Sequence, residues 1–231
     1  MPFTISKGRA EYPKDYPNDW PAYEFFVERE DLTSEVVKGF EKLVHSNSGE
    51  TALDNYLTEN PSILSAFLNT FSTGHNGSWV IPKQNIKMKV GVDPGLIPDF
   101  LVGGQSSFGI TWYVVELKGA NNKLFTRKQS GKMAFTEYAN EAFLQTLGYI
   151  NYCQWDAAYL RSQKIMPELR DINTVLILGR DSETNDDPKM KELKAGLNNF
   201  SNNISIRSFD AVLRACQLEA AFQASNNKGG R

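Results

Sequence analysis

Apolar side chains recur at helical spacing in the first third of the chain. Residues 32–46, 50–60 and 62–71 each place an apolar side chain at every third or fourth position, which is the pattern of one buried helix face. Asn60-Pro61 separates the second segment from the third, because the residue before a proline avoids the helical conformation. The pattern therefore predicts three consecutive helices with short connections.

The middle of the chain changes to the pattern of β-strands. Trp79-Val80-Ile81 begins a strand-like region, and residues 86–92 alternate apolar side chains with lysines, as in a half-buried strand. Residues 97–102 and 110–118 are two further apolar runs, and the Gly/Ser-rich turn between them is typical of a hairpin. The second run is apolar throughout from Trp112 to Val115, which predicts a central and fully buried strand.

The rest of the chain alternates between helix and strand. The complete order predicts an α/β fold in which helices flank a mixed central β-sheet. The end of the chain is expected to be disordered. The expected elements are a helix over residues 136–160, a strand over 174–178, a helix over 189–200, a strand over 204–206, a helix over 209–224 and a tail over 225–231.

Residues 1–45 are interpreted as an N-terminal extension followed by the first helix. A long helix is not expected before residue 32, because Pro13, Pro17 and Pro21 would interrupt it. This extension carries several aromatic side chains between Trp20 and Phe26. They are able to pack as an arm on the core of the same chain or on another subunit.

Composition limits the classes of function. The 231 residues suit one large domain, and 41% hydrophobic with 12% aromatic residues suffices for a buried core. The formal net charge of −2 means that any contact with nucleic acid needs a local basic surface. No apolar run approaches the roughly 20 residues of a membrane span, and the N-terminus has no apolar signal core. We expect a cytoplasmic protein with no membrane partner, in which Cys153 and Cys216 are reduced thiols.

The hairpin over residues 97–118 carries charged side chains that folding would bring together. Asp99 precedes its first strand, and Glu116 and Lys118, two residues apart on the second, share one face. Mg²⁺ prefers oxygen ligands and usually takes only one or two protein carboxylates. The sequence therefore predicts a Mg²⁺ site for phosphodiester hydrolysis, with Asp99, Glu116 and the Leu117 carbonyl as ligands. Lys118 would orient the attacking water or stabilise the negative transition state.

Positive charges follow this hairpin directly. They are Lys123, Arg127, Lys128 and Lys132. One interpretation is a solvated face, and the other is a surface that contacts nucleic acid beside the site. Arg180, after the strand over 174–178, is likewise able to contact phosphate or to form a structural ion pair.

The charged motifs resemble those of a known nuclease superfamily. Pro98-Asp99 followed by Glu116-Leu117-Lys118 is similar to the PD-(D/E)XK signature. Gln145-Thr-Leu-Gly-Tyr149 resembles the Gln-x-x-x-Tyr helix of its RecB-like branch. Within that superfamily the chain most resembles the Shedu anti-phage nuclease domain. The stretches that carry this resemblance are residues 50–64, 98–100, 114–118 and 204–213.

The resemblance implies a restriction-endonuclease-like core over residues 46–224 and a Mg²⁺-dependent DNA endonuclease of prokaryotic anti-phage defence. It makes Asp99 and Glu116 metal ligands and Lys118 the catalytic lysine, with Mn²⁺ able to replace Mg²⁺. Gln145 would line the site as a further catalytic residue, and Tyr149 would support it and the bound nucleic acid. The resemblance implies DNA as partner and a homo-oligomer, either dimer or tetramer, without a small-molecule cofactor.

The superfamily often adds a glutamate from an early helix to the metal site. Glu50 is the first choice and Glu59 the alternative, although Glu50 is also explained as a charge favoured at a helix N-terminus. The sequence departs from the family where Gly119-Ala120 follows the catalytic lysine, since a proline is expected nearby. Only residues 1–45 are available for the variable N-terminal region that Shedu proteins commonly carry. A non-cleaving nucleic-acid-binding or oligomeric interaction module on the same fold stays an alternative.

Overall fold

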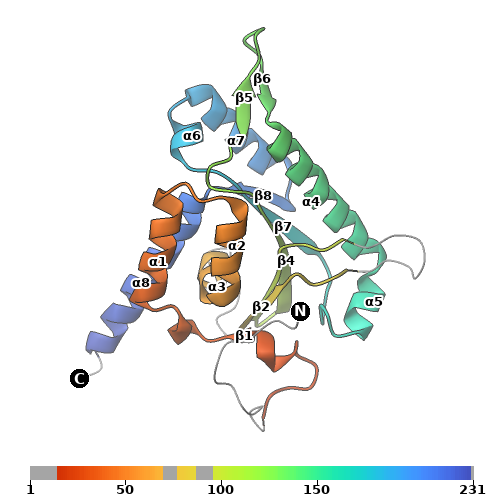
Figure 1. Ribbon diagram of the computed structural model, residues 1–231. Coiled ribbons are helices and arrows are strands. Elements are labelled where there is room, and N and C mark those ends of the chain that lie inside the picture. The colour runs from red at the N-terminus through yellow and green to blue at the C-terminus, as the bar shows by residue number, and fades with distance from the viewer. Residues whose placement is uncertain (1–14, 70–76, 87–95, 230–231) are drawn as a thin grey trace.

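The computed structural model describes residues 15–69, 77–86 and 96–229, and a six-stranded sheet forms its centre (Figure 1). The strand order is β1-β2-β3-β4-β7-β8. Neighbours from β1 to β4 are antiparallel, whereas β4, β7 and β8 run parallel. The predicted α/β fold with a mixed sheet is confirmed. The strands are β1 Phe26–Val27, β2 Ser78–Pro82, β3 Phe100–Ser106, β4 Gly109–Leu117, β7 Ile172–Ile177 and β8 Ile204–Arg207.

Helices cover both faces of the sheet (Figure 1). Helices α1, α2, α3 and α8 pack on one face, and α4, α5 and α7 pack on the other. None of the helices in the described ranges is long and apolar enough to cross a membrane. The helices are α1 Ser34–His45, α2 Glu50–Glu59, α3 Ser62–Asn69, α4 Glu137–Trp155, α5 Ala157–Ser162, α6 Ser182–Asn185, α7 Pro188–Phe200 and α8 Phe209–Gly229, with short 3-10 helices η1 Tyr23–Phe25 and η2 Arg29–Asp31.

Strand β4 is buried on both faces, as its continuous apolar run predicts. Tyr113 and Val115 pack toward α1, α3 and α8, whereas Trp112 and Val114 pack toward α4 and α5. Burying a large apolar side chain contributes about 2 kcal/mol relative to leaving it exposed. Because side chains alternate along a strand, this packing also directs Glu116 toward the face that α4 covers.

The N-terminal arm packs on the sheet of its own chain. Trp20 and Phe26 make edge contacts with Trp79 on β2, with ring centroids 5.0 and 5.7 Å apart. The Trp79 indole N–H also donates to the Tyr16 hydroxyl at 2.6 Å. Of the two expected packing modes, the described part of the arm shows packing on the core of its own chain.

Some predicted boundaries were wrong. The helix expected over residues 136–160 is divided at Asp156 into α4 and α5, since aspartate favours helix ends over helix interiors. The last helix does not end at Ala224 but continues to Gly229, so residues 225–229 of the expected disordered tail are helical. No proline or glycine lies between Ala224 and Gly229 to end the helix earlier. Of the strand expected over 86–92, Ile86 forms a single bridge to Leu96, and the others lie outside the described residues.

Candidate active site

Three neighbouring strands place a row of charged residues at one end of the sheet. The pairing of Pro82 with Phe100 continues to Lys83, whose backbone N–H donates to the Asp99 carbonyl at 3.0 Å. Strand β3 pairs with β4 so that Phe100 faces Val115. Asp99 therefore lies beside the end of β4, where its Oδ2 accepts from the Leu117 N–H at 2.6 Å. The predicted hairpin forms, and it brings Asp99 to the end of β4.

Glu116 is the most buried charged side chain of this row. It is 4% exposed, and its Oε1 lies 3.1 Å from the Lys118 ammonium. Its Oε2 accepts from the Tyr149 hydroxyl of α4 at 2.9 Å. Burial, together with the nearby Asp99 carboxylate, raises the pKa of Glu116 to about 7. A buried, incompletely neutralised carboxylate is typical of functional sites.

The ammonium of Lys118 is held between carboxylates from two elements. Glu116 lies at the end of β4, two residues before Lys118. The Glu50 carboxylate of α2 lies 3.6 Å from the Lys118 ammonium. Burial alone would lower the pKa of Lys118, but Glu116 and then Glu50 raise it above its ordinary value overall. Lys118 is therefore a charged group fixed beside two acidic side chains.

Helix α2 contributes two carboxylates, one turn apart. Leu53 and Leu57 bury its inner face, and this fixes the side of the helix that meets the strand ends. Glu50 contacts Lys118, and Asp54, four residues later, lies 3.1 Å from the Lys83 ammonium. Glu59 is exposed at the last position of the helix. The structure thus brings Glu50 to the site, and Asp54 with it.

Lys83 and Asp54 are site residues that the sequence reasoning missed. The Lys83 ammonium contacts both Asp99 Oδ1 and Asp54 Oδ1. No spacing motif marks Lys83, because the connection between β2 and β3 decides which residue faces Asp99. The one available signal was a charged residue directly after the apolar run that ends at Pro82.

Gln145 lies one turn before Tyr149 on α4, so both side chains point to the same side of the helix. Its Oε1 is buried and has no hydrogen-bond partner within the described ranges. An unmatched buried acceptor is costly, and a bound group or water would satisfy it. The Leu117 carbonyl points toward the Asp99 side of β4, because the Leu117 N–H donates to Asp99 and the N–H and C=O of one strand residue point to the same side.

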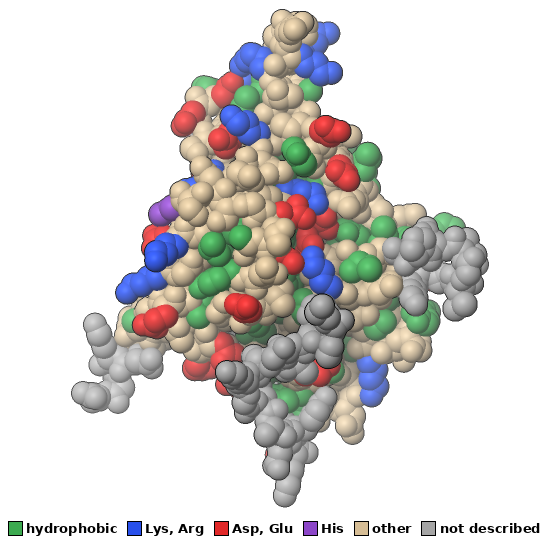
Figure 2. Space-filling view, in the orientation of Figure 1, with side chains coloured by type: hydrophobic (Ala, Val, Ile, Leu, Met, Phe, Trp, Pro, Cys, Tyr) green, Lys and Arg blue, Asp and Glu red, His purple; other side chains and the backbone are tan. Residues whose placement is uncertain are grey.

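The predicted basic run forms a small hairpin of β5 Phe125–Arg127 and β6 Met133–Phe135. Two of its charges have acidic partners. Lys123 lies 3.2 Å from Glu183, and Arg127 lies 2.8 Å from Asp187. Lys128 and Lys132 are exposed and form no ion pair with any residue that the structure describes. Basic side chains gather accordingly around the projecting hairpin in Figure 2.

Asp and Glu side chains gather near the middle of the face in Figure 2, with basic side chains beside them. Among the described residues, no three His, Cys, Asp or Glu side chains converge closely enough to hold a metal ion by themselves. Mg²⁺ needs less than that, because water and substrate phosphate complete its octahedron. Asp99 and Glu116 are two buried carboxylates at neighbouring strand ends. Burial first, and then the Asp99 carboxylate, raises the pKa of Glu116, and a bound cation would stabilise both carboxylates in their charged form. The donor set therefore fits Mg²⁺ or Mn²⁺.

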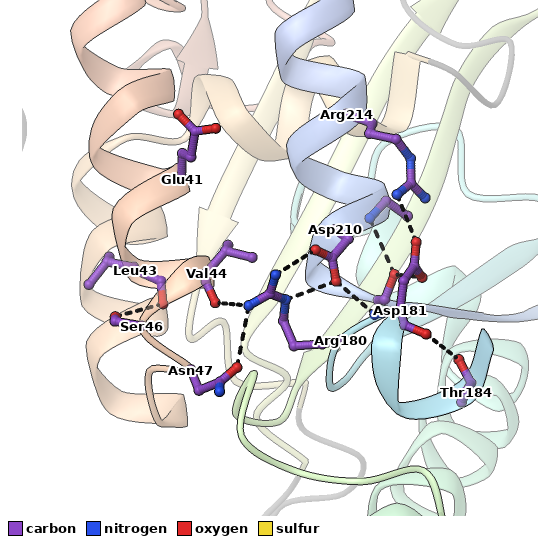
Figure 3. A network of polar contacts seen from close by, with 12 residues as sticks. Glu41, Leu43, Val44, Ser46, Asn47, Arg180, Asp181, Thr184, Asp210 and Arg214 are labelled. Atoms are coloured by element: carbon purple, nitrogen blue, oxygen red, sulfur yellow. Dashed lines mark hydrogen bonds and ion pairs between the residues drawn. The ribbon is translucent and has the colours of Figure 1, made fainter. Parts of the chain in front are cut away.

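Arg180 belongs to a separate polar network at the end of β7 (Figure 3). Its guanidinium donates to both oxygens of Asp210, at 2.9 and 2.8 Å. The same group donates to the Val44 carbonyl at the end of α1. Of the two interpretations of Arg180, the structure shows the ion pair, which ties α1 to the start of α8.

Comparison with known proteins agrees with the motifs. A family model described as Shedu protein SduA, C-terminal, matches residues 47–213. The match covers most of the chain and includes every residue of the candidate site from Glu50 to Tyr149. No curated protein matches the chain.

Proposed function

The chain belongs to the Shedu protein SduA C-terminal family, a family of anti-phage defence, and we propose that it is a divalent-metal-dependent DNA nuclease. The observation that carries this proposal is the buried pair of Asp99 and Glu116 with Lys118 beside it. The position of these residues at adjacent strand ends of a mixed sheet supports a restriction-endonuclease-like core.

Asp99, Glu116 and the Leu117 carbonyl are the groups that would hold Mg²⁺ or Mn²⁺. When bound, such an ion activates a water molecule and withdraws charge from the attacked phosphate. Tyr149 fixes one oxygen of Glu116 by its hydrogen bond, so that the carboxylate keeps one orientation. Gln145 supplies a free acceptor on the same helix face.

Lys118 has the electrostatic role in this proposal. Phosphodiester hydrolysis builds negative charge on the phosphoryl oxygens, and a fixed ammonium stabilises that charge more in the transition state than in the ground state. Glu116 and Glu50 hold the Lys118 ammonium in place and keep it protonated. No reorganisation of this group is then needed during the reaction.

The β5–β6 hairpin is the proposed contact for the DNA backbone. Lys128 and Lys132 are exposed on it and have no acidic partner among the residues described. Phosphate contacts by lysine supply affinity without sequence preference. Because the net charge of the chain is −2, such a local surface is where DNA would be attracted.

Plasmid cleavage tests the proposal directly. Supercoiled DNA is incubated with the protein and Mg²⁺ or Mn²⁺, and nicked and linear products are quantified. We expect products with either metal, none with EDTA, and none with Asp99→Asn. Lys38→Met, which changes an exposed lysine of α1, is the control and should cleave like the wild type. Binding of DNA without any product under either metal would instead favour the non-cleaving module.

A further inference from the structure

Lys83 is a second lysine in the candidate site, and the chemistry proposed above does not use it. Its ammonium contacts Asp99 Oδ1 and lies 3.1 Å from Asp54 Oδ1. Its side chain is 34% exposed, so a route to solvent remains open. The positively charged Lys83 ammonium is thus already paired with Asp99, the carboxylate that is expected to bind a metal ion.

The backbone of Lys83 is held in an uncommon conformation. Its φ of 49° lies in the left-handed region, which side chains with a Cβ occupy rarely. Such conformations persist where surrounding contacts hold them, and they concentrate at functional sites. Here the backbone N–H bonds to the Asp99 carbonyl while the side chain bonds to the Asp99 carboxylate. Both ends of Lys83 are therefore directed to one partner.

Asp99 has little room for two cations. Its Oδ2 already accepts from the Leu117 N–H at 2.6 Å. The Lys83 ammonium lies on the other oxygen. A divalent ion bound to Asp99 would lie within a few ångströms of this ammonium, and like charges at such distances repel strongly in a partly buried site.

We propose that Lys83 is a resident counter-ion of the candidate metal site, which competes with the divalent cation for Asp99 and lowers the affinity of the site for it. The inference rests on the proposed function, because it takes Asp99 as a metal ligand. Asp54 is the carboxylate that keeps the ammonium when it leaves Asp99. Lysine is a cation at neutral pH, and the contacts of Lys83 with Asp99 and Asp54 are ion pairs.

Removing the charge of Lys83 tests the competition. Mn²⁺ binding is titrated for wild type and Lys83→Met, with free Mn²⁺ measured by its electron paramagnetic resonance signal and no DNA present. We expect Lys83→Met to bind Mn²⁺ roughly tenfold more tightly, because a repelling charge is lost. Lys164→Met is the matched control: Lys164 also has a positive φ, 54°, and its ammonium donates to the Asn18 carbonyl at 2.7 Å. Its affinity should equal that of the wild type.

Each result decides between roles of Lys83. Affinity of Lys83→Met that equals or falls below the wild type overturns the inference, and leaves the proposed function intact if the wild type binds Mn²⁺. If neither the wild type nor Lys83→Met binds Mn²⁺, both the inference and the proposed function are overturned. Should Lys83→Met fail to fold, amine labelling of the wild type followed by mass spectrometry replaces it. Labelling of Lys83, relative to Lys164, must then rise when Mn²⁺ is added, and an unchanged ratio contradicts competition.

Discussion

Two polar networks lie at the ends of neighbouring strands, and they differ in how their charges are matched. At the end of β7, Arg180 binds both oxygens of Asp210, and the Asp181 N–H donates to the same carboxylate at 2.7 Å. Asp181 in turn accepts from Ser208 and Arg214. The two carboxylates of this network, Asp181 and Asp210, are thus matched by two guanidinium groups, Arg180 and Arg214.

At the end of β4 the carboxylates outnumber the ammonium groups. Glu50, Asp54, Asp99 and Glu116 surround Lys83 and Lys118. The pKa values of the carboxyl groups in the two networks differ accordingly. Burial would raise the pKa of Asp210, but Arg180 lowers it below its ordinary value, whereas burial and Asp99 raise that of Glu116 to about 7. The comparison indicates that the candidate site is the network at the end of β4, where carboxylates exceed cations, and not the charge-balanced network at the end of β7.

The largest expected effect is a loss of DNA cleavage when the network at the end of β4 is changed. Lys118→Met removes the charge beside the attacked phosphate, so DNA cleavage should fall by about a thousandfold. The melting temperature should fall by only a few degrees, because Glu116, whose pKa is already about 7, can take up a proton when its ammonium partner is lost. Single-turnover cleavage and thermal unfolding measure the two quantities. A variant that cleaves normally would remove the role proposed for Lys118.

Arg180→Met should show the reverse behaviour. The change leaves Asp210 without its Arg180 partner and removes the donor to the Val44 carbonyl. Breaking a partly buried ion pair together with this hydrogen bond costs about 3 kcal/mol of unfolding free energy. Urea unfolding measures the loss. Cleavage per folded molecule should stay near the wild-type value, because Arg180 touches none of the site residues. A large loss of activity in fully folded protein would join the two networks functionally.

Glu116→Gln should stabilise the metal-free protein above neutral pH. The pKa of Glu116 rises from its ordinary 4.5 to about 7 on folding, so the folded state holds the proton more tightly. Wild-type stability therefore falls as pH rises from 4.5 to 7, and a glutamine escapes this loss. We expect an advantage of roughly 3 kcal/mol at pH 8 that disappears near pH 4. Unfolding measured in EDTA across this range checks it, and a constant difference would contradict the raised pKa.

The sequence predicted the part of the site that lies close together along the chain. Asp99, Glu116 and Lys118 belong to one hairpin, whose turn and apolar runs set the register. Glu50 was named because the resemblance implies a glutamate from an early helix, and the start of that amphipathic helix is visible from its period. The hairpin and the helix start are both local signals in the sequence.

The remaining site residues depend on contacts between distant segments. Lys83 reaches Asp99 only because β2 pairs with β3, and Asp54 reaches Lys83 only because α2 packs across the strand end. The break at Asp156 and the helix beyond Ala224 were missed for a related reason. Helix limits follow from packing and capping geometry, which composition signals only weakly.

The smallest expected effect concerns the hairpin that would hold DNA. Lys128→Met with Lys132→Met removes two charges that have no ion pair among the described residues. DNA affinity should therefore fall by about threefold near physiological salt, and the salt dependence by about two ion equivalents. Lys123→Met with Arg127→Met is the matched control, since these cations have acidic partners in the chain. Removing Lys123 and Arg127 also leaves Glu183 and Asp187 without their cations, and these carboxylates can repel DNA. The salt dependence of binding, rather than affinity alone, therefore distinguishes the two double variants. Fluorescence anisotropy at several salt concentrations measures both, and equal slopes for the two double variants would show that DNA does not contact the hairpin tip.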